Sequence, residues 1–366
     1  MLVDRIRMNA YRQAIQATVQ EGDVVADLGT GSGIMAFFAV QAGAKKVYAI
    51  EQEAVITEAA QLAASNGMLD RIVFIKGSCD QVDLPEPVDV IISEFIGFFG
   101  LEENLLSIDF RDRFLKAGGS LVPAWLDLYL TPVESPELWY TTVGLWGKDF
   151  YGLDFSSVRS EGFSSRYVTN CQGKIRGMAS ESPLSHLDFY TLTKIPTTFT
   201  LRIPLESTGT IHGYVGYFKV GLSPQTVLST SPDEPPTHWE QVFFPLQEPV
   251  EVQAGDILEC EITAFQSGKV CWRWDTKIIS KKLQHVKFSQ HNWQISKEEL
   301  LINRNEFVPA LAQSGEIQKL ILDSCNGRRT MTEIAKIVQE IYPEQYKNLM
   351  EALTATRLIL LGKILI

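Results

Sequence analysis

The stretch VADLGTGSG, residues 25–33, decides the fold of the first third of this 366-residue chain. An apolar, strand-like run reaches Asp27, and three glycines then form the turn that opens the helical segment IMAFFAVQAGA. Glycine lets the backbone approach a ligand closely, where a side chain would collide. A strand, a glycine-rich turn and a helix indicate a nucleotide-type site, although many tight turns of this kind are simply rich in glycine.

The segments around this stretch extend the pattern into a parallel sheet. Apolar residues recur at helical spacing from residue 5 to about 19, and the strand-like segments KVYAIE, RIVFIKG and VDVIISE follow, with an alanine-rich helix from about 53 to 65. Apolar strands that alternate with helices are typical of a doubly wound α/β sheet. We therefore expect a Rossmann-like domain over residues 1–123.

The periodicity changes twice after Pro123. Segments such as DLYLTPV, TTFTLRIPL and GYVGYFKVGL alternate with period two, which predicts a β-barrel domain over residues 124–290. Residues 139–180 follow neither period and are expected to form an arm. Residues 297–366 read as three helices and a short apolar segment, LGKILI, which predicts a small winged-helix-like domain.

Charge and composition exclude several classes of protein. The chain has 33 basic and 44 acidic residues and a net charge of -11, so it repels phosphate backbones; we expect no nucleic-acid partner, and a basic substrate is favoured. No apolar run reaches the ~18 residues of a membrane span. The five cysteines contain no C-x-x-C pair, so neither a disulfide framework nor a metal site is indicated. Without an apolar signal segment, we expect a cytoplasmic protein.

Acidic residues at the ends of three strands indicate the cofactor. Glu51 ends KVYAIE, where it can accept both hydroxyls of a ribose, and Asp80 follows the next strand, where it can accept from an adenine amino group. The phosphate-binding lysine motif is absent from the sequence. Asp27 would repel a pyrophosphate but attract the sulfonium and ammonium groups of S-adenosylmethionine, which is therefore favoured over NAD.

Two glutamates flank the aromatic loop in SEFIGFFGLEEN. Glu94 and Glu103 lie on either side of Gly97 and Gly100, and a loop with these glycines can fold back and bring both carboxylates together. Apolar surroundings would partly desolvate the pair, which then calls for a planar cation that bonds both acids. The guanidinium of arginine fits this requirement. Two solvated surface acids are the alternative.

Here the sequence resembles the protein arginine methyltransferase family. The segments MLVDRIRMNAYR, VADLGTGSGIMAFFAVQAGAKKVYAIE, SEFIGFFGLEEN and STSPDEPPTHWEQ follow in family order and spacing over about residues 1–280. The resemblance implies a binding site for S-adenosylmethionine in which Arg7 holds the carboxylate, Asp27, Gly29 and Gly31 line the methionine portion, Glu51 holds the ribose and Asp80 the adenine.

The same resemblance implies an acceptor site and a mechanism. Glu94 and Glu103 would clamp the substrate guanidinium, a poor nucleophile because its pKa exceeds 12. The two carboxylates would orient the attacking nitrogen, and Glu103 would take the proton. His238 and Trp239 would close the site from the barrel side. His238, paired to Asp4, would pass the proton to solvent, or it would make a purely structural bond.

Two features concern the cover and the assembly of the site. The family carries a further helix before the MLxDxxR segment, and this sequence begins inside that segment. We expect a more open cofactor site, a cover from another chain or from the C-terminal domain, or a loss of activity. The arm corresponds to the family's dimerisation arm, which implies a head-to-tail homodimer; a flexible surface insertion is the alternative.

The C-terminal segment SGEIQKLILDSCNGRRTMTEIAKIVQE is similar to PqqD-type peptide-recognition domains. Such domains dock the leader of a ribosomally made precursor peptide by strand addition. Basic and acidic side chains balance from residue 297 onward, which is unlike a winged helix that grips DNA. A packing or dimerisation module is the alternative.

The sequence therefore predicts an S-adenosylmethionine-dependent N-methyltransferase for the guanidino group of arginine in a peptide or protein, including a ribosomal precursor peptide. Two alternatives remain open. One is a catalytically weak scaffold that binds arginine peptides, and the other is a methyltransferase of a small guanidine or amine metabolite. The degree of methylation is not readable from these residues.

Overall fold

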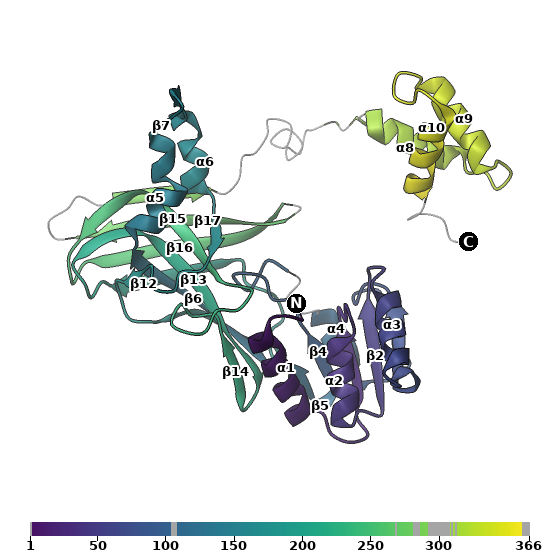
Figure 1. Ribbon diagram of the computed structural model, residues 1–366, viewed down its shortest axis with the longest axis horizontal. Coiled ribbons are helices and arrows are strands. Elements are labelled where there is room, and N and C mark those ends of the chain that lie inside the picture. Colours follow the sequence, from purple (N-terminus) through teal and green to yellow (C-terminus); the bar gives the residue numbers. More distant parts are fainter. Residues whose placement is uncertain are drawn as a thin grey trace. The chain divides into compact units, whose positions relative to one another are not determined.

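A computed structural model describes residues 2–103, 108–267, 269–280, 286–291, 308, 310–311 and 313–360. The chain divides into one compact unit of Met1–Gln294 and a second unit of Ile295–Ile366. The first unit contains a parallel sheet with its helices and, after it, two antiparallel sheets with a projecting arm (Figure 1).

The parallel sheet has five strands in the order β3-β2-β1-β4-β5. Its elements are α1 (Arg5–Thr18), β1 (Val24–Leu28), α2 (Ile34–Ala42), β2 (Lys46–Glu51), α3 (Ile56–Ser65), the 3-10 turn η1 (Leu69–Arg71), β3 (Ile72–Lys76), β4 (Val88–Ser93), α4 (Ile108–Phe114) and β5 (Leu115–Val122). Every residue of β1 is buried, because β1 is the central strand and helices cover it. The expected Rossmann-like sheet is thereby confirmed.

The register of the central strands places the chemistry at one edge. Leu28, at the end of β1, pairs with Ile50 in β2 and with Ser93 in β4. Because parallel strands end at the same edge of a sheet, the residues that follow them meet there. The glycine turn, Glu51 and Glu94 are therefore neighbours although they are far apart in sequence.

The expected β-barrel is built from two antiparallel sheets. A seven-stranded sheet contains β6 (Trp125–Glu134), β9 (Tyr167–Thr169), β10 (Arg176–Gly177), β11 (Pro183–Asp188), β13 (Gly209–Ser223), β14 (Thr226–Ser229) and β15 (Gln241–Val252). A four-stranded sheet contains β12 (Thr198–Pro204), β16 (Ile257–Ser267), β17 (Lys269–Ile279) and β18 (Val286–His291). The period-two pattern is borne out in β12, where Phe199 and Leu201 are buried between exposed neighbours, whereas β13 and the first half of β15 are buried on consecutive residues.

One apolar core joins the parallel sheet to the antiparallel sheets. It contains Ile92 from β4, Phe99 from the loop after β4, and Leu126 and Phe244 from β6 and β15. Gly216 in β13 leaves space for Phe99, because a Cβ atom at that position would lie 2.8 Å from the Phe99 ring. The loop after β4 is thus anchored on the antiparallel sheets.

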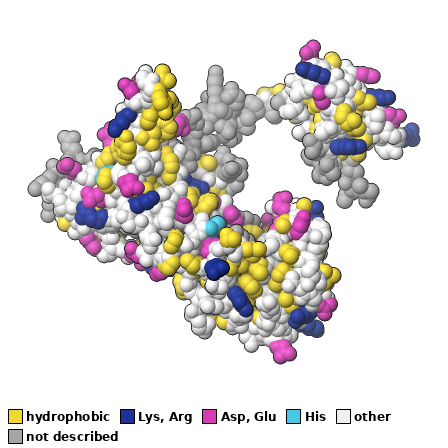
Figure 2. Space-filling model, viewed as in Figure 1, with side chains coloured by type: hydrophobic (Ala, Val, Ile, Leu, Met, Phe, Trp, Pro, Cys, Tyr) yellow, Lys and Arg dark blue, Asp and Glu magenta, His cyan; other side chains and the backbone are white. Residues whose placement is uncertain are grey.

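Residues 136–164 project from the seven-stranded sheet as an arm (Figure 1), whereas β9 and β10, which also fall within the predicted range 139–180, are strands of that sheet. The arm is built from α5 (Pro136–Thr142), the 3-10 turns η2 (Gly144–Gly147) and η3 (Ser156–Val158), α6 (Arg159–Ser164) and a small hairpin of β7 (Asp149–Phe150) and β8 (Leu153–Asp154). Short elements explain why neither helical nor strand periodicity was visible in the sequence. Figure 2 shows hydrophobic side chains over much of this projection.

In the part of the second unit that the structure describes, the chain forms α8 (Gln313–Ser324), α9 (Met331–Ile341) and α10 (Leu349–Leu360). Their apolar faces pack together through Ile317, Ile321, Ile334, Val338 and Leu360. The expected LGKILI segment lies outside the described residues, so the winged-helix-like and PqqD-like assignments stay predictions. Within the described parts of the whole chain, no helix has the length and apolar character needed to cross a membrane.

Candidate active site

A cavity of about 290 Å³ lies at the carboxyl ends of β1, β2 and β4. We call it the sheet-edge cavity, and its lining residues are Gly29, Ile50, Glu51, Gln52, Gly77, Ser78, Cys79, Glu94, Phe95 and Glu103. The structure thus brings together four residues that the sequence singled out: Gly29 and Glu51 from the stretch 25–51, and Glu94 and Glu103 from the loop 93–104. This is the topology at which open α/β sheets bind ligands.

The glycine turn presents its backbone to this cavity. Gly29 has a φ of 67°, and the Phe95 ring covers the place where a Cβ atom would stand. The N–H of Gly31 donates to Glu51 Oε2 at 3.0 Å, and the N–H of Glu53 donates to the other carboxylate oxygen. Glu51 is therefore tied to the turn and points toward it.

Asp27 lies behind the turn instead of lining the cavity. Its buried carboxylate accepts hydrogen bonds from Thr30 Oγ1 at 2.5 Å and from the N–H of Ala36 at 3.0 Å. Burial raises the pKa of Asp27 to about 6, and these hydrogen bonds oppose the shift. Asp27 thus shapes the turn and the start of α2. Asp80 is exposed and follows Cys79, which lines the cavity.

Arg7 of α1 is buried and reaches Glu94. Its Nη1 donates to Glu94 Oε2 at 3.1 Å, and its guanidinium carbon lies 4.8 Å from the centre of the Trp239 ring. Among the described residues, Arg7 Nε and Nη2 have no hydrogen-bond partner although both atoms are buried. A buried guanidinium with unfilled donors fits an additional acceptor, such as a ligand carboxylate.

Burial also sets the protonation of the two glutamates in the cavity. It raises the pKa of Glu94 to about 7, against the opposing charge of Arg7. Burial raises the pKa of Glu103 as well, and the neighbouring carboxylate of Glu102 adds to the shift. A cation between Glu94 and Glu103 would restore the charged form of both acids, because opposite charge favours ionisation.

Asp4 links α1 to the segment THW. Its Oδ1 accepts from the N–H of Arg7 at 3.1 Å, and its Oδ2 accepts from the backbone N–H of His238 at 3.0 Å. The imidazole Nδ1 of His238 lies 3.7 Å from Asp4 Oδ2, which is too long for a hydrogen bond. Asp4 and His238 are therefore adjacent, as expected, but the hydrogen bond between them involves the backbone N–H of His238 and not its imidazole.

His238 and Trp239 occupy different surroundings. Burial and the charge of Arg7 lower the pKa of His238, which favours its neutral form. Trp239 is only 1% exposed, and its Nε1 donates to the carbonyl oxygen of Ile96 at 2.7 Å. Trp239 thus holds the loop that contains Glu94 from behind and does not line the sheet-edge cavity.

Glu102 is a further acid beside the cavity that the sequence did not predict as a site residue. Its carboxylate accepts from the N–H of Phe99 at 2.8 Å and from Trp272 Nε1 at 3.3 Å, and Arg166 Nη2 lies 3.6 Å away. The acidic doublet at 102 and 103 was a visible signal. Arg166 and Trp272 gave none, because only the folding of the antiparallel sheets brings them to the loop.

Comparison with known families first gives the class of protein. Residues 11–97 match the family described as "Ribosomal protein L11 methyltransferase", and residues 126–282 match the "Arginine methyltransferase oligomerization subdomain". All residues that line the sheet-edge cavity except Glu103 belong to the first of these regions. The fold and the site therefore define a methyltransferase.

Individual relatives then give the family. The chain is 32% identical to protein arginine N-methyltransferase 6 of Danio rerio, with 79% of this chain and 88% of the relative covered. It is 31% identical to the probable protein arginine N-methyltransferase 6 of Arabidopsis thaliana, with 73% and 72% covered. The chain therefore belongs to the protein arginine N-methyltransferase family.

A solved structure shares the fold at lower identity. The Trypanosoma brucei enzyme-prozyme heterotetrameric complex with S-adenosylhomocysteine, an assembly of protein arginine methyltransferase 1, matches with a TM-score of 0.72 and 24% identity. The match covers 80% of this chain and 96% of that chain.

The raised pKa of Glu94 predicts how stability depends on pH. Between about pH 4.5 and pH 7 folded Glu94 retains a proton that the unfolded chain releases, so the contribution of Glu94 to the free energy of unfolding falls as the pH rises. Glu94→Gln should remove this contribution, while the fall that comes from other buried acids such as Asp27 stays. From about pH 5 to about pH 8, the free energy of unfolding of the variant should rise relative to that of the wild type by at most about 3 kcal/mol. Urea unfolding at each pH measures this difference.

The control for this measurement is Glu58→Gln, which changes an exposed carboxyl group in α3. Its stability should follow the pH in parallel with the wild type. Parallel curves for Glu94→Gln as well would contradict the raised pKa of Glu94.

Proposed function

We propose that this enzyme holds the guanidinium of an arginine side chain between Glu94 and Glu103 while the methyl group is transferred. The protein is an S-adenosylmethionine-dependent protein arginine N-methyltransferase. One observation carries the residue-level proposal: two carboxylates, that of Glu94 largely buried and that of Glu103 partly so, share the sheet-edge cavity with the glycine turn. A planar cation with several donors suits this arrangement.

The residues in and around the cavity fit S-adenosylmethionine, which supplies the electrophilic methyl group when bound. Arg7 has two buried donors that make no hydrogen bond within the described chain, although Nε lies 3.9 Å from Asp4 Oδ2, and these donors suit the cofactor's carboxylate. Gly29 and Gly31 allow close approach of the backbone. Glu51 would accept from the ribose hydroxyls, and Asp80 would accept from the adenine amino group.

Glu94 and Glu103 divide the acceptor chemistry. Arg7 already donates to Glu94, so Glu94 orients the guanidinium while keeping an internal partner. Glu103 is exposed on one side and has a raised pKa, which suits a group that takes a proton and returns it to water. Together the carboxylates localise the cation's charge away from the attacking nitrogen.

His238 would then carry the proton toward solvent. Its side chain is 45% exposed, and its lowered pKa leaves it neutral and able to accept a proton near pH 7. Asp4 fixes the backbone of His238 by its hydrogen bond and stabilises the imidazolium through space.

The arm supports a homodimer. The region matched to the oligomerization subdomain, residues 126–282, includes it, and the related Trypanosoma brucei assembly is a heterotetramer. Tyr151 and Leu153 at the tip of the arm are exposed apolar side chains, which a soluble surface rarely groups without a partner.

The substrate is an arginine-containing protein or peptide. We propose that the C-terminal unit presents it, on the PqqD-like resemblance of the sequence. Precursor-peptide specificity and a cytoplasmic location rest on the sequence in the same way.

Replacing Glu103 tests the assignment of the base. Glu103→Gln should lower kcat by about a hundredfold or more while S-adenosylmethionine still binds, because the amide cannot take the proton. Mass spectrometry of an arginine-containing peptide measures the transfer, and Glu58→Gln is the matched control. A Gln variant as fast as the wild type would show that another group is the base.

Replacing Arg7 tests the cofactor contact. Arg7→Met should weaken S-adenosylmethionine about ten- to a hundredfold in isothermal titration, since a charge-assisted hydrogen bond is lost. Arg5→Met removes an exposed arginine from the same helix and should leave the affinity unchanged. If Arg7→Met and Arg5→Met bind S-adenosylmethionine with equal affinity, Arg7 does not contact the cofactor.

Replacing the tip of the arm tests the dimer. The double change Tyr151→Asp and Leu153→Asp should convert a dimer to a monomer in light scattering, because burying two carboxylates in an interface is costly. Met350→Asp, on an exposed position of α10, should keep the dimer mass. A wild-type protein that is monomeric at micromolar concentration would contradict the proposal.

A further inference from the structure

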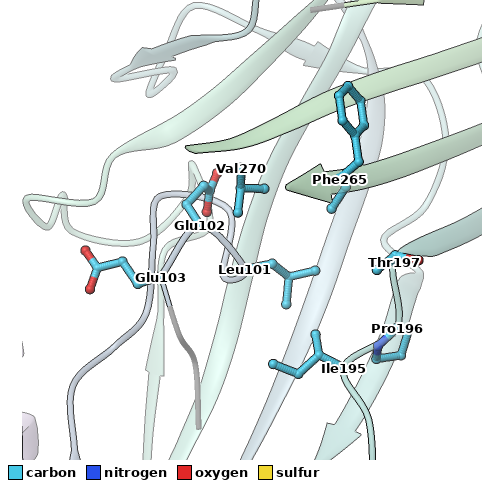
Figure 3. A pocket seen from close by; sticks show the side chains of 9 residues that line it. Leu101, Glu102, Glu103, Ile195, Pro196, Thr197, Phe265 and Val270 are labelled. Atoms are coloured by element: carbon cyan, nitrogen blue, oxygen red, sulfur yellow. The ribbon is translucent and has the colours of Figure 1, made fainter. Parts of the chain in front are cut away.

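A second cavity, of about 420 Å³, opens beside Glu103. We call it the apolar pocket, because most of the residues that line it are apolar: Leu101, Ile195, Pro196, Ala264, Phe265 and Val270, with Glu102, Glu103 and Thr197. They come from the loop after β4, from the connection between β11 and β12, and from the hairpin of β16 and β17. Figure 3 shows these side chains around one space.

Glu103 is the wall that the two cavities share. In Figure 3 its carboxylate points away from Leu101 and Ile195 and leaves the apolar side chains on its other side. An arginine held by this carboxylate in the sheet-edge cavity would therefore have the apolar pocket next to it. Residues adjacent to that arginine in a bound peptide would lie within reach, since consecutive Cα atoms are about 3.8 Å apart.

The chemistry of the pocket selects an apolar group. Its second acid, Glu102, already accepts from Phe99 and Trp272, and Arg166 lies beside it. Burial raises the pKa of Glu102, so the charged form is disfavoured further. Apart from Glu103, the pocket thus offers little unneutralised charge to a second basic side chain, and its other lining residues are apolar except Thr197.

We propose that the apolar pocket binds a large apolar side chain of the substrate that lies close in sequence to the methylated arginine. The inference rests on the proposed function, because it takes Glu103 as part of the acceptor site. A cavity of about 420 Å³ has room for a leucine or phenylalanine side chain. Burying such a group strengthens binding by about ten- to a hundredfold.

A peptide series tests this specificity in the full-length protein. Each peptide carries a single arginine among glycines and serines. One position is varied at a time, among the three before and the three after the arginine, and it holds leucine, serine or lysine. At one of these positions, leucine should lower KM about tenfold relative to serine, with kcat little changed. Equal KM values for leucine and serine at every position, or a preference for lysine, would overturn the proposal.

Two variants then assign the effect to the pocket. Thr197→Trp fills it from the exposed rim and should bring the leucine-to-serine ratio of kcat/KM close to one. Thr200→Trp adds the same side chain on the exposed face of β12, outside the pocket, and should keep the preference. A Thr197→Trp variant that retains the full leucine preference would place the apolar side chain elsewhere.

A third variant remains informative if the tryptophan disturbs folding. Val270→Ala enlarges the pocket and should shift the preference from leucine toward phenylalanine, and an unchanged order would count against the pocket. The failure of this inference is distinct from failure of the proposed function. In the first case the wild type methylates leucine and serine peptides equally; in the second it methylates neither, or Glu103→Gln is as active as the wild type.

Discussion

The site depends on one buried cation. Arg7 enters from α1, donates to Glu94 at the end of β4 and lies on the ring of Trp239, which follows β14. Three separate parts of the chain thus converge on a single guanidinium. A buried charge of this kind is tolerated only while it is paired. A movement of α1, of the loop after β4 or of the THW segment would separate Arg7 from its partners and destabilise the fold.

The same desolvation makes the glutamates receptive to cations. An ionised carboxylate without water around it is unfavourable, which is why burial raises the pKa of Glu94 and of Glu103. A guanidinium that enters the cavity would offset this cost of burying charge, and it would be attracted more strongly than in bulk water.

The sequence predicted the parallel sheet from local patterns, and it predicted the grouping of Glu51, Glu94 and Glu103 from the strand ends together with the family resemblance. The glycines and Glu51 stand at strand ends, and parallel strands bring such residues together. The sequence did not predict that two motif residues lie behind the cavity and do not line it. Asp27 accepts hydrogen bonds from Thr30 and Ala36, and Trp239 supports the loop from within the core. Arg166 and Trp272 escaped notice because tertiary pairing alone takes them to Glu102.

The antiparallel sheets fix the position of the loop after β4. Phe99 packs where Gly216 leaves room, and Trp272 donates to the acid next to Glu103. The position of the loop after β4 is set by β13 and β17, while Glu94 and Glu103 at its two ends line the sheet-edge cavity. A loop held from both sides can bring a desolvated acid to a ligand at a fixed distance, which a loop held only by β4 could not do.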